Sequence, residues 1–155
     1  MNKATLHIIQ GFLGAGKSTF SKKLSVDVGA MHFNPDEWVE KLFESKDYEK
    51  DFGKCFNVAM DTIWQKAVEC LSSGTDVVLD MGFWHRKDRD YAKSTAEKCN
   101  ANFKHYYICA PDEVLKQRLA SRAGKVAENN VRKFDEIKKQ FQEPETDENP
   151  IVIHS

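Results

Sequence analysis

Short apolar runs alternate with longer segments of helical periodicity along the 155 residues of the chain. Short apolar runs bounded by turn residues are typical of buried strands, whereas apolar residues spaced three or four apart are typical of helices. Because helical segments separate the strands, the chain is predicted to form an α/β three-layer sandwich with a parallel sheet and right-handed crossovers. We predict five strands, at Thr5–Gln10, 31–33, Asp76–Asp80, Phe103–Ala110 and Ile151–Ile153.

The predicted helices lie between these strands. The first begins near Lys17 and runs to Val28, and the others cover 36–43, 52–72, 86–100, 111–122 and 131–142. The longest helix carries apolar residues three or four positions apart, and this stripe is expected to face the core: Phe52, Phe56, Ala59, Met60, Ile63, Ala67 and Leu71. Residues 143–150 are acidic and are predicted to form a connecting loop.

The composition is that of one soluble globular domain covering residues 1–155. Hydrophobic residues make up 41% and charged residues 30% of the chain, and the formal net charge is −1. This balance provides no general attraction to nucleic acid or to anionic lipid, so a nucleic-acid partner is not expected. The oligomeric state is left open between monomer and homodimer.

The cysteine spacing and the length of the apolar segments indicate the cellular compartment of the protein. The four cysteines lie far apart and form no C-x-x-C pair, so free thiols in a reducing compartment are expected. The apolar run before Gly11 is too short for a signal peptide, and no segment is long enough to span a membrane. We therefore expect a cytoplasmic protein without a membrane partner.

One motif carries specific chemistry. Residues Gly11–Thr19 satisfy G-x-x-x-x-G-K-[ST], and they lie between a predicted strand and a predicted helix, as a phosphate-binding loop must. The glycines let backbone N–H groups point inward around an anion, and the helix N-terminus adds its positive dipole end. We predict that ATP is bound by Gly11, Gly14, Ala15, Gly16, Lys17, Ser18 and Thr19, with Lys17 between the β- and γ-phosphates and Ser18 as a ligand of Mg²⁺.

Asp36 is the candidate catalytic base. It follows the second strand, where its carboxylate could take the proton of an attacking hydroxyl group. The alternative is that it merely complements the dipole of a helix capped by Asn34, with Pro35 as the first helical residue and Glu37 as the third. We favour the catalytic interpretation because the phosphate-binding loop is expected at the same edge of the sheet.

Asp80 ends the third strand after a hydrophobic run, as the carboxylate of a Walker B motif does. It is predicted to bind Mg²⁺ or to contact the acceptor, and the alternative is a strand-end cap. Two aromatic residues follow: Phe83 and Trp84 could stack on an acceptor or pack beneath the loop. His85 is interpreted as a surface histidine.

Arg118 and Arg122 lie four residues apart and therefore project from one face of a helix. A lid at about residues 119–131 is predicted, because Gly124 and the two asparagines at 129 and 130 loosen the chain after this helix. Arginines on a lid can close over phosphates and neutralise charge in the transition state. Arg122 is the stronger candidate, and the alternative is a solvated basic face.

With these residues assembled, the chain resembles small P-loop kinases of the nucleoside-monophosphate-kinase-like group, especially zeta toxins, chloramphenicol phosphotransferase and the kinase domain of phage polynucleotide kinase. The motifs that carry the resemblance are Gly11–Thr19, Asn34–Trp38, Val78–Trp84 with Arg86 and Arg89, and Pro111–Arg122. The resemblance implies a P-loop NTPase fold with strand order 2-3-1-4-5. It also implies that Asp36 activates the acceptor, that Arg122 contacts phosphates and that Arg118 stacks on adenine.

The sequence therefore favours an ATP-dependent phosphotransferase that moves the γ-phosphate to a hydroxyl group of a small molecule. A 5′-hydroxyl polynucleotide kinase is one alternative, and it would need a basic channel for which Arg86, Lys87 and Arg89 are the local cluster. A non-catalytic nucleotide-binding switch is the other. Such a switch would need neither Asp36 nor a lid arginine.

Overall fold

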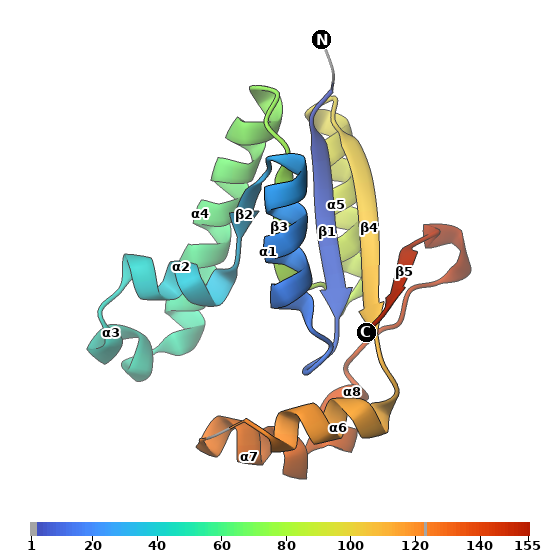
Figure 1. Ribbon diagram of the computed structural model, residues 1–155. Helices are drawn as coiled ribbons and strands as arrows, with labels where there is room; N and C mark the ends of the chain where they lie inside the picture. Colours follow the sequence, from blue (N-terminus) through green and yellow to red (C-terminus); the bar gives the residue numbers. More distant parts are fainter. Residues whose placement is uncertain (1–2, 123) are drawn as a thin grey trace.

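The computed structural model describes residues 3–122 and 124–155. Strands and helices alternate through most of the chain (Figure 1). The five predicted strands and the helices predicted before residue 123 are found with shifts of one or two residues at their ends, and a short helix at Ser45–Lys50 was not predicted. The strands are β1 (Thr5–Gly11), β2 (Met31–Phe33), β3 (Val77–Gly82), β4 (Asn102–Cys109) and β5 (Ile151–His154). The helices are α1 (Lys17–Val28), α2 (Pro35–Leu42), α3 (Ser45–Lys50), α4 (Phe52–Ser72), α5 (Arg86–Lys98), α6 (Asp112–Ala120), α7 (Lys125–Arg132) and α8 (Phe134–Lys138).

The five strands form one parallel sheet in the order β2-β3-β1-β4-β5, which confirms the order implied by the resemblance. The central strand β1 pairs with β3 through Ile8 and Leu79 and with β4 through Ile8 and His105. The pairing of β1 with β3 shifts register between Ile9 and Gln10, just before the phosphate-binding loop. All strands run in one direction, so their carboxyl ends meet at one edge of the sheet (Figure 1).

Helices cover both faces of this sheet and confirm the three-layer sandwich. Alternate residues of β1 and β3 point to opposite faces. Ile8 and Leu79 join the apolar cluster under α4 and α5, whereas Ile9 and Val78 join the cluster beneath α1 and α6. The helices α6, α7 and α8 gather below the carboxyl edge of the sheet, which is where an α/β sheet binds its ligand (Figure 1).

The predicted stripe on α4 is partly wrong. The buried residues of this helix are Cys55, Ala59, Ile63, Ala67 and Leu71, a row with four-residue spacing that packs against the sheet and α2. Phe52 is instead 50% exposed, and Phe56 and Met60 are only partly buried. The stripe turns away from the core at its N-terminal end because α4 extends past the sheet there, beside α2 and α3 (Figure 1).

The helix predicted at 131–142 is also wrong. The structure has two shorter helices, α7 and α8, which meet at Lys133, and the predicted lid at 119–131 takes in the end of α6 and most of α7. The helix is interrupted at Lys133, and two aromatic side chains that follow, Phe134 and Phe141, reach the core. Phe134 is 1% exposed and Phe141 is 7% exposed, and both pack edge-on against Phe12.

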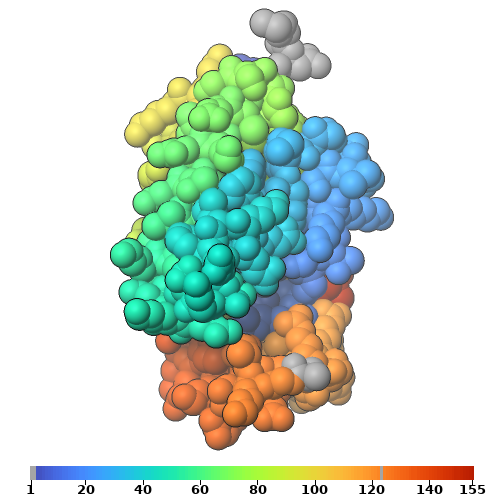
Figure 2. All heavy atoms as spheres, turned by 90° about the vertical axis from the view of Figure 1, so that its left-hand side faces the viewer, coloured from blue at the N-terminus to red at the C-terminus, as the bar shows by residue number. Residues whose placement is uncertain are grey.

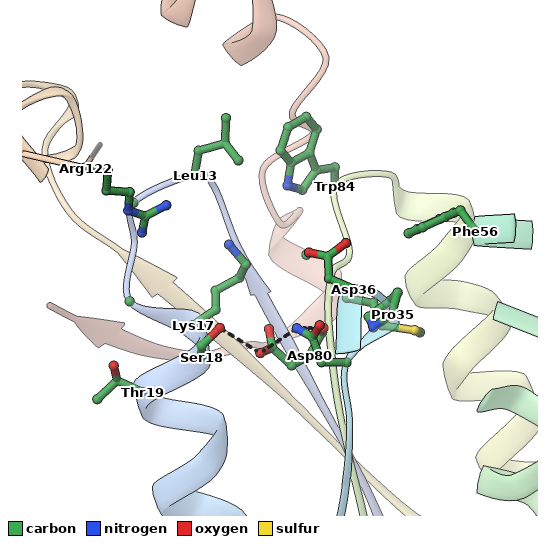
Figure 3. A pocket seen from close by; sticks show the side chains of 15 residues that line it. Leu13, Lys17, Ser18, Thr19, Pro35, Asp36, Phe56, Asp80, Trp84 and Arg122 are labelled. Atoms are coloured by element: carbon green, nitrogen blue, oxygen red, sulfur yellow. Dashed lines mark hydrogen bonds between the residues drawn. The ribbon is translucent and has the colours of Figure 1, made fainter. Parts of the chain in front are cut away.

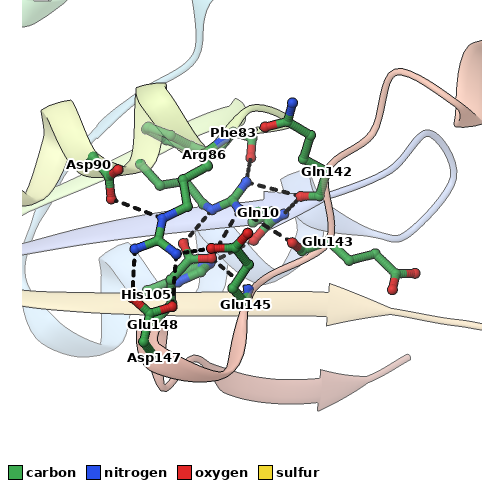
Figure 4. Close-up of polar contacts among 11 residues, drawn as sticks. Gln10, Phe83, Arg86, Asp90, His105, Gln142, Glu143, Glu145, Asp147 and Glu148 are labelled. Atoms are coloured by element: carbon green, nitrogen blue, oxygen red, sulfur yellow. Dashed lines mark hydrogen bonds and ion pairs between the residues drawn. The ribbon is translucent and has the colours of Figure 1, made fainter.

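The acidic segment 143–150 is more than a connecting loop. Glu145, Asp147 and Glu148 form ion pairs with Arg86 and Arg89 on α5, and a short 3-10 helix covers Thr146–Glu148 (Figure 4). No helix among the described residues is long and apolar enough to cross a membrane.

Candidate functional site

The phosphate-binding loop joins β1 to α1. Gly16 caps α1 with φ of 92°, a left-handed conformation that residues other than glycine rarely adopt. A side chain at Gly11 would come within 2.9 Å of the Lys17 Cγ, so glycine is needed there for the lysine to cross the loop. Lys17 Nζ donates a hydrogen bond to the Phe12 carbonyl at 3.0 Å, which holds the ammonium over the loop.

The loop forms one wall of a cavity of about 380 Å³ at the carboxyl edge of the sheet. In Figure 2 this face of the molecule is hollowed between the cyan atoms of α2 and α3 and the orange atoms of α6 and α7. The cavity gathers residues that are distant in sequence: Leu13, Gly14, Gly16, Lys17, Ser18, Thr19, Asn34, Pro35, Asp36, Phe56, Asp80, Met81, Gly82, Trp84 and Arg122 (Figure 3). The predicted loop, base, strand-end carboxylate and lid arginine therefore share one pocket.

Ser18 and Asp80 meet at the floor of this pocket. The Ser18 Oγ donates a hydrogen bond to Asp80 Oδ2 at 3.2 Å, and Asn34 Nδ2 donates to the same oxygen at 3.3 Å (Figure 3). Asp80 is 3% exposed, and burial raises the pKa of its carboxyl. The neighbouring His32, Lys17 and Asn34 outweigh this effect and hold that pKa below its usual range, so the carboxylate stays ionised.

This pair of groups fits Mg²⁺. A hydroxyl oxygen and an ionised carboxylate are the hard oxygen ligands that this ion prefers, and they lie beside the lysine of the loop. No cluster of three or more histidine, cysteine, aspartate or glutamate side chains that could hold a metal ion occurs among the described residues. A metal here would therefore need water and phosphate oxygens to complete its coordination.

Asp36 lies in the first turn of α2 and points into the pocket (Figure 3). The predicted cap is present, because the Asn34 side chain accepts a hydrogen bond from the Glu37 backbone N–H at 3.2 Å. Partial burial raises the pKa of the Asp36 carboxyl, the negative charges of Asp80 and Glu40 raise it further, and Lys17 opposes them. A carboxylate with a raised pKa binds a proton more readily, as a general base requires.

Two cations face these carboxylates. Burial lowers the pKa of Lys17; the nearby Arg122 lowers it too, while Asp80 and Asp36 raise it. Arg122 is exposed, follows the end of α6, and lies beside the phosphate-binding loop, on the side of the pocket away from Asp36 (Figure 3). Both cations therefore lie on the loop side of the space in front of Asp36.

Arg118 lies behind the loop rather than in the pocket. Its Nη1 donates hydrogen bonds to the Gly14 carbonyl at 3.2 Å and to the Ser155 hydroxyl at 3.0 Å. The Ser155 hydroxyl in turn donates to the Ala15 carbonyl at 2.8 Å. Arg118 therefore braces the back of the phosphate-binding loop, and its predicted contact with adenine stays a prediction.

The two aromatic residues after β3 have different positions: Phe83 packs in the core, and Trp84 lines the pocket. Phe83 is 3% exposed and packs in the core under α4 and α5. Trp84 lines the pocket, donates a hydrogen bond from Nε1 to the Gly11 carbonyl at 3.2 Å, and packs against Phe12 with ring centroids 5.0 Å apart. Sequence reasoning missed Phe56 as a lining residue because its spacing on α4 matched a core position.

Solved structures share this fold at low sequence identity. A gluconokinase from Sinorhizobium meliloti 1021 matches with a TM-score of 0.68 and 14% identity, over 99% of this chain and 84% of that one. A sugar kinase from Janibacter sp. HTCC2649 matches with a TM-score of 0.67 and 15% identity, over 99% and 86%. Kti12 of Chaetomium thermophilum in complex with ADP-AlF3 matches with a TM-score of 0.65 and 13% identity, over 96% and 88%.

These similarities show the fold, which is that of a P-loop NTPase. No curated protein matches the chain in sequence. A family model described as an AAA domain matches residues 6–144, a span that contains the phosphate-binding loop, Asp36, Asp80 and Arg122. On this match the chain belongs to the AAA domain family called AAA_33.

Proposed function

We propose that this protein is an ATP-dependent kinase that transfers the γ-phosphate to a hydroxyl group of a small molecule. The observation that carries the proposal is the position of Asp36, which faces Lys17 across the pocket that the phosphate-binding loop forms. A nucleotide bound by the loop would direct its γ-phosphate into the space between them. A protein that only bound nucleotide would need no carboxylate facing Lys17 across this pocket.

In the proposed reaction, Asp36 accepts the proton of the acceptor hydroxyl as the oxygen attacks the γ-phosphorus. A bond forms between that oxygen and phosphorus, the bond from phosphorus to the β,γ-bridging oxygen breaks, and ADP leaves with the electron pair. Lys17 and Arg122 offset the negative charge that develops on the transferred group. The products are a phosphate ester, ADP and the proton held by Asp36.

Ser18 and Asp80 would hold Mg²⁺, which when bound neutralises charge on the β- and γ-phosphates. Asn34 keeps the Asp80 carboxylate oriented through its side-chain amide, and the same side chain caps the helix that carries Asp36. One residue thus positions both carboxylates of the site. This shared support favours a site in which the two act together.

The polynucleotide kinase alternative loses its basic channel in this arrangement. Arg86 forms ion pairs with Glu145 and Asp147, and Arg89 is buried with Glu148, so neither guanidinium faces the pocket (Figure 4). The solved sugar kinase and gluconokinase act on small molecules by name, which agrees with a small acceptor here. We therefore propose a small-molecule alcohol rather than a nucleic-acid end.

The test is a phosphotransfer assay with ATP, Mg²⁺ and a panel of sugars, gluconate, nucleosides, aromatic alcohols and oligonucleotides, with ADP and the phosphate ester both measured. In the variant Asp36→Asn we expect turnover to fall by about 10²-fold or more while ATP affinity stays near that of the wild type. Glu37→Gln is the matched control, because Glu37 is the neighbouring exposed carboxylate on the same helix turn. Equal turnover of both variants and the wild type would refute the role of Asp36.

A further inference from the structure

A second cavity opens beside the reaction pocket, between α4 and α5. Its volume is about 210 Å³. It adjoins the reaction pocket, because Met81 and Trp84 line both. The residues that form it come from the two helices and from the segment after β3: Met60, Trp64, Met81, Phe83, Trp84, His85, Asp88 and Tyr91.

Aromatic rings dominate the walls of this second cavity. Phe83 lies at the buried end, and Trp64 meets Tyr91 edge-on with ring centroids 4.9 Å apart. Tyr91 lines the cavity and is 55% exposed, so its ring is accessible from solvent. Concave apolar surface that folding leaves exposed in this way is typical of a ligand site.

The charges around the cavity select against anions. None of the described residues that line it is a lysine or an arginine. Its acidic and imidazole side chains are Asp88 and His85, whose Oδ2 and Nδ1 atoms lie 3.6 Å apart. The reaction pocket differs, because the cations Lys17 and Arg122 line it together with the carboxylates Asp36 and Asp80. A carboxylate or phosphate in the second cavity would meet Asp88 and aromatic faces, whereas an uncharged or cationic ring would be favoured there.

We propose that the second cavity holds an apolar or aromatic ring of the acceptor, while the hydroxyl group to be phosphorylated lies at Asp36 in the reaction pocket. Met81 and Trp84 line both spaces, so an acceptor with its ring in one and its hydroxyl group in the other would contact these two side chains. The acceptor is then an uncharged or cationic alcohol that carries a ring, and not a sugar acid. This inference rests on the proposed kinase function, which it makes more specific.

The size of the cavity agrees with this class of ligand. An apolar cavity of about 150 Å³ is large enough to bind benzene. A space of about 210 Å³ therefore admits one ring with small substituents. Met60 and Met81 add adaptable, polarizable walls that pack well against aromatic rings.

The experiment measures binding and transfer separately on the full chain. Ligand-observed NMR saturation transfer and calorimetry are carried out with three ring alcohols (2-phenylethanol, tyrosol and tryptophol) and with gluconate, in the presence of Mg²⁺ and a non-hydrolysable ATP analogue. The same compounds are then offered with ATP. The variants are Tyr91→Ala, which removes an exposed aromatic wall, and Tyr91→Phe, which keeps the ring. Val26→Ala is the control, because Val26 is an 81% exposed apolar residue on α1, outside the second cavity.

We expect the wild type to bind at least one ring alcohol more tightly than gluconate. Tyr91→Ala should weaken that binding by about five- to tenfold, the loss expected for one aromatic contact, and raise KM more than it lowers kcat. Tyr91→Phe and Val26→Ala should bind like the wild type. Stronger binding of gluconate, or a Tyr91→Ala variant that binds ring alcohols normally, would overturn the proposed subsite. Ring binding without phosphate transfer to any alcohol would instead overturn the kinase proposal and leave the subsite standing.

Discussion

Replacing Arg89 by methionine tests how the segment after α8 is held to the nucleotide-binding core. The Arg89 side chain is 2% exposed, and its Nε and Nη2 donate to the two carboxylate oxygens of Glu148 at 2.6 and 3.1 Å. Its Nη1 also donates to the backbone carbonyls of Phe83 and Gln142, both at 3.0 Å (Figure 4). Methionine would fill the space but remove both guanidinium donors from the buried Glu148 carboxylate, which would keep only the Glu145 backbone N–H. The Phe83 carbonyl would lose its donor, whereas the Gln142 carbonyl would keep the Gln10 side-chain amide.

The expected loss of stability is large. Removing one partner of a buried, hydrogen-bonded ion pair lowers the free energy of unfolding by about 3–5 kcal/mol, because the remaining charge stays desolvated. The Glu148 side chain is 7% exposed and cannot regain full hydration without movement of the chain. A domain of this size loses about 2–4 °C of Tm per kcal/mol, so Arg89→Met should melt about 6–20 °C below the wild type.

Arg86→Met is the matched control. Arg86 lies three positions earlier on α5 and pairs with the same acidic segment, but its side chain is 31% exposed and its partners Glu145 and Asp147 are more than 60% exposed. Water replaces these contacts when they are lost, so the change in stability should be far smaller.

Urea unfolding and thermal melting of the wild type and both single variants measure the difference. The double variant Arg89→Met with Glu148→Met should regain part of the stability, because no charge is then left buried. Equal losses from Arg86→Met and Arg89→Met would refute the reasoning from burial.

Three other predictions concern the site and its support. Lys17→Ala should abolish phosphate transfer and weaken ATP binding, measured by calorimetry, because its ammonium lies over the phosphate-binding loop; turnover near that of the wild type would contradict this. Arg122→Lys should fail to restore the turnover lost in Arg122→Ala, since a point charge does not replace a planar guanidinium, while melting should be unchanged in both. Burial lowers the pKa of His105 from 6.5 to about 4, so stability should be full above pH 6.5 and fall by up to about 3 kcal/mol as the pH drops toward 4. The variant His105→Gln, compared with the wild type in melts across this range, should lack that component.

The fold could be predicted because its signals are local. The apolar run of β3 and the glycine, lysine and serine spacing of the phosphate-binding loop each lie within a few residues, and they fix a strand, a turn and a helix start. The position of Asp36 followed from its place directly after the second strand, and the Asn34 cap that starts its helix is a contact between near neighbours. Parallel strand order then brings these ends to one edge of the sheet.

The sequence did not show which residues contact each other when they lie far apart along the chain. Arg86 and Arg89 looked like a basic cluster because their partners lie 59 to 61 residues further along the chain. The acidic residues at 145–148 looked like a solvated loop for the same reason. The prediction of one helix at 131–142 was wrong for a similar reason. The helix is interrupted at Lys133, and Phe134 packs against Phe12. Local periodicity does not reveal this contact, because Phe12 lies far away in the sequence.

The segment from Asp80 to Trp84 joins the parts of the proposed site. Its first residue contacts Ser18 of the phosphate-binding loop, and its last donates a hydrogen bond to the Gly11 carbonyl at the start of that loop. Gly82 has φ of 78°, and a Cβ there would lie 3.1 Å from the Trp84 indole, so the backbone at Gly82 has room for that ring only because it lacks a side chain. The same indole is a wall of both cavities. In the proposed function, nucleotide and acceptor would be bound against one short segment. Its conformation, held by Arg89 through the Phe83 carbonyl, would then set how their reacting groups face each other.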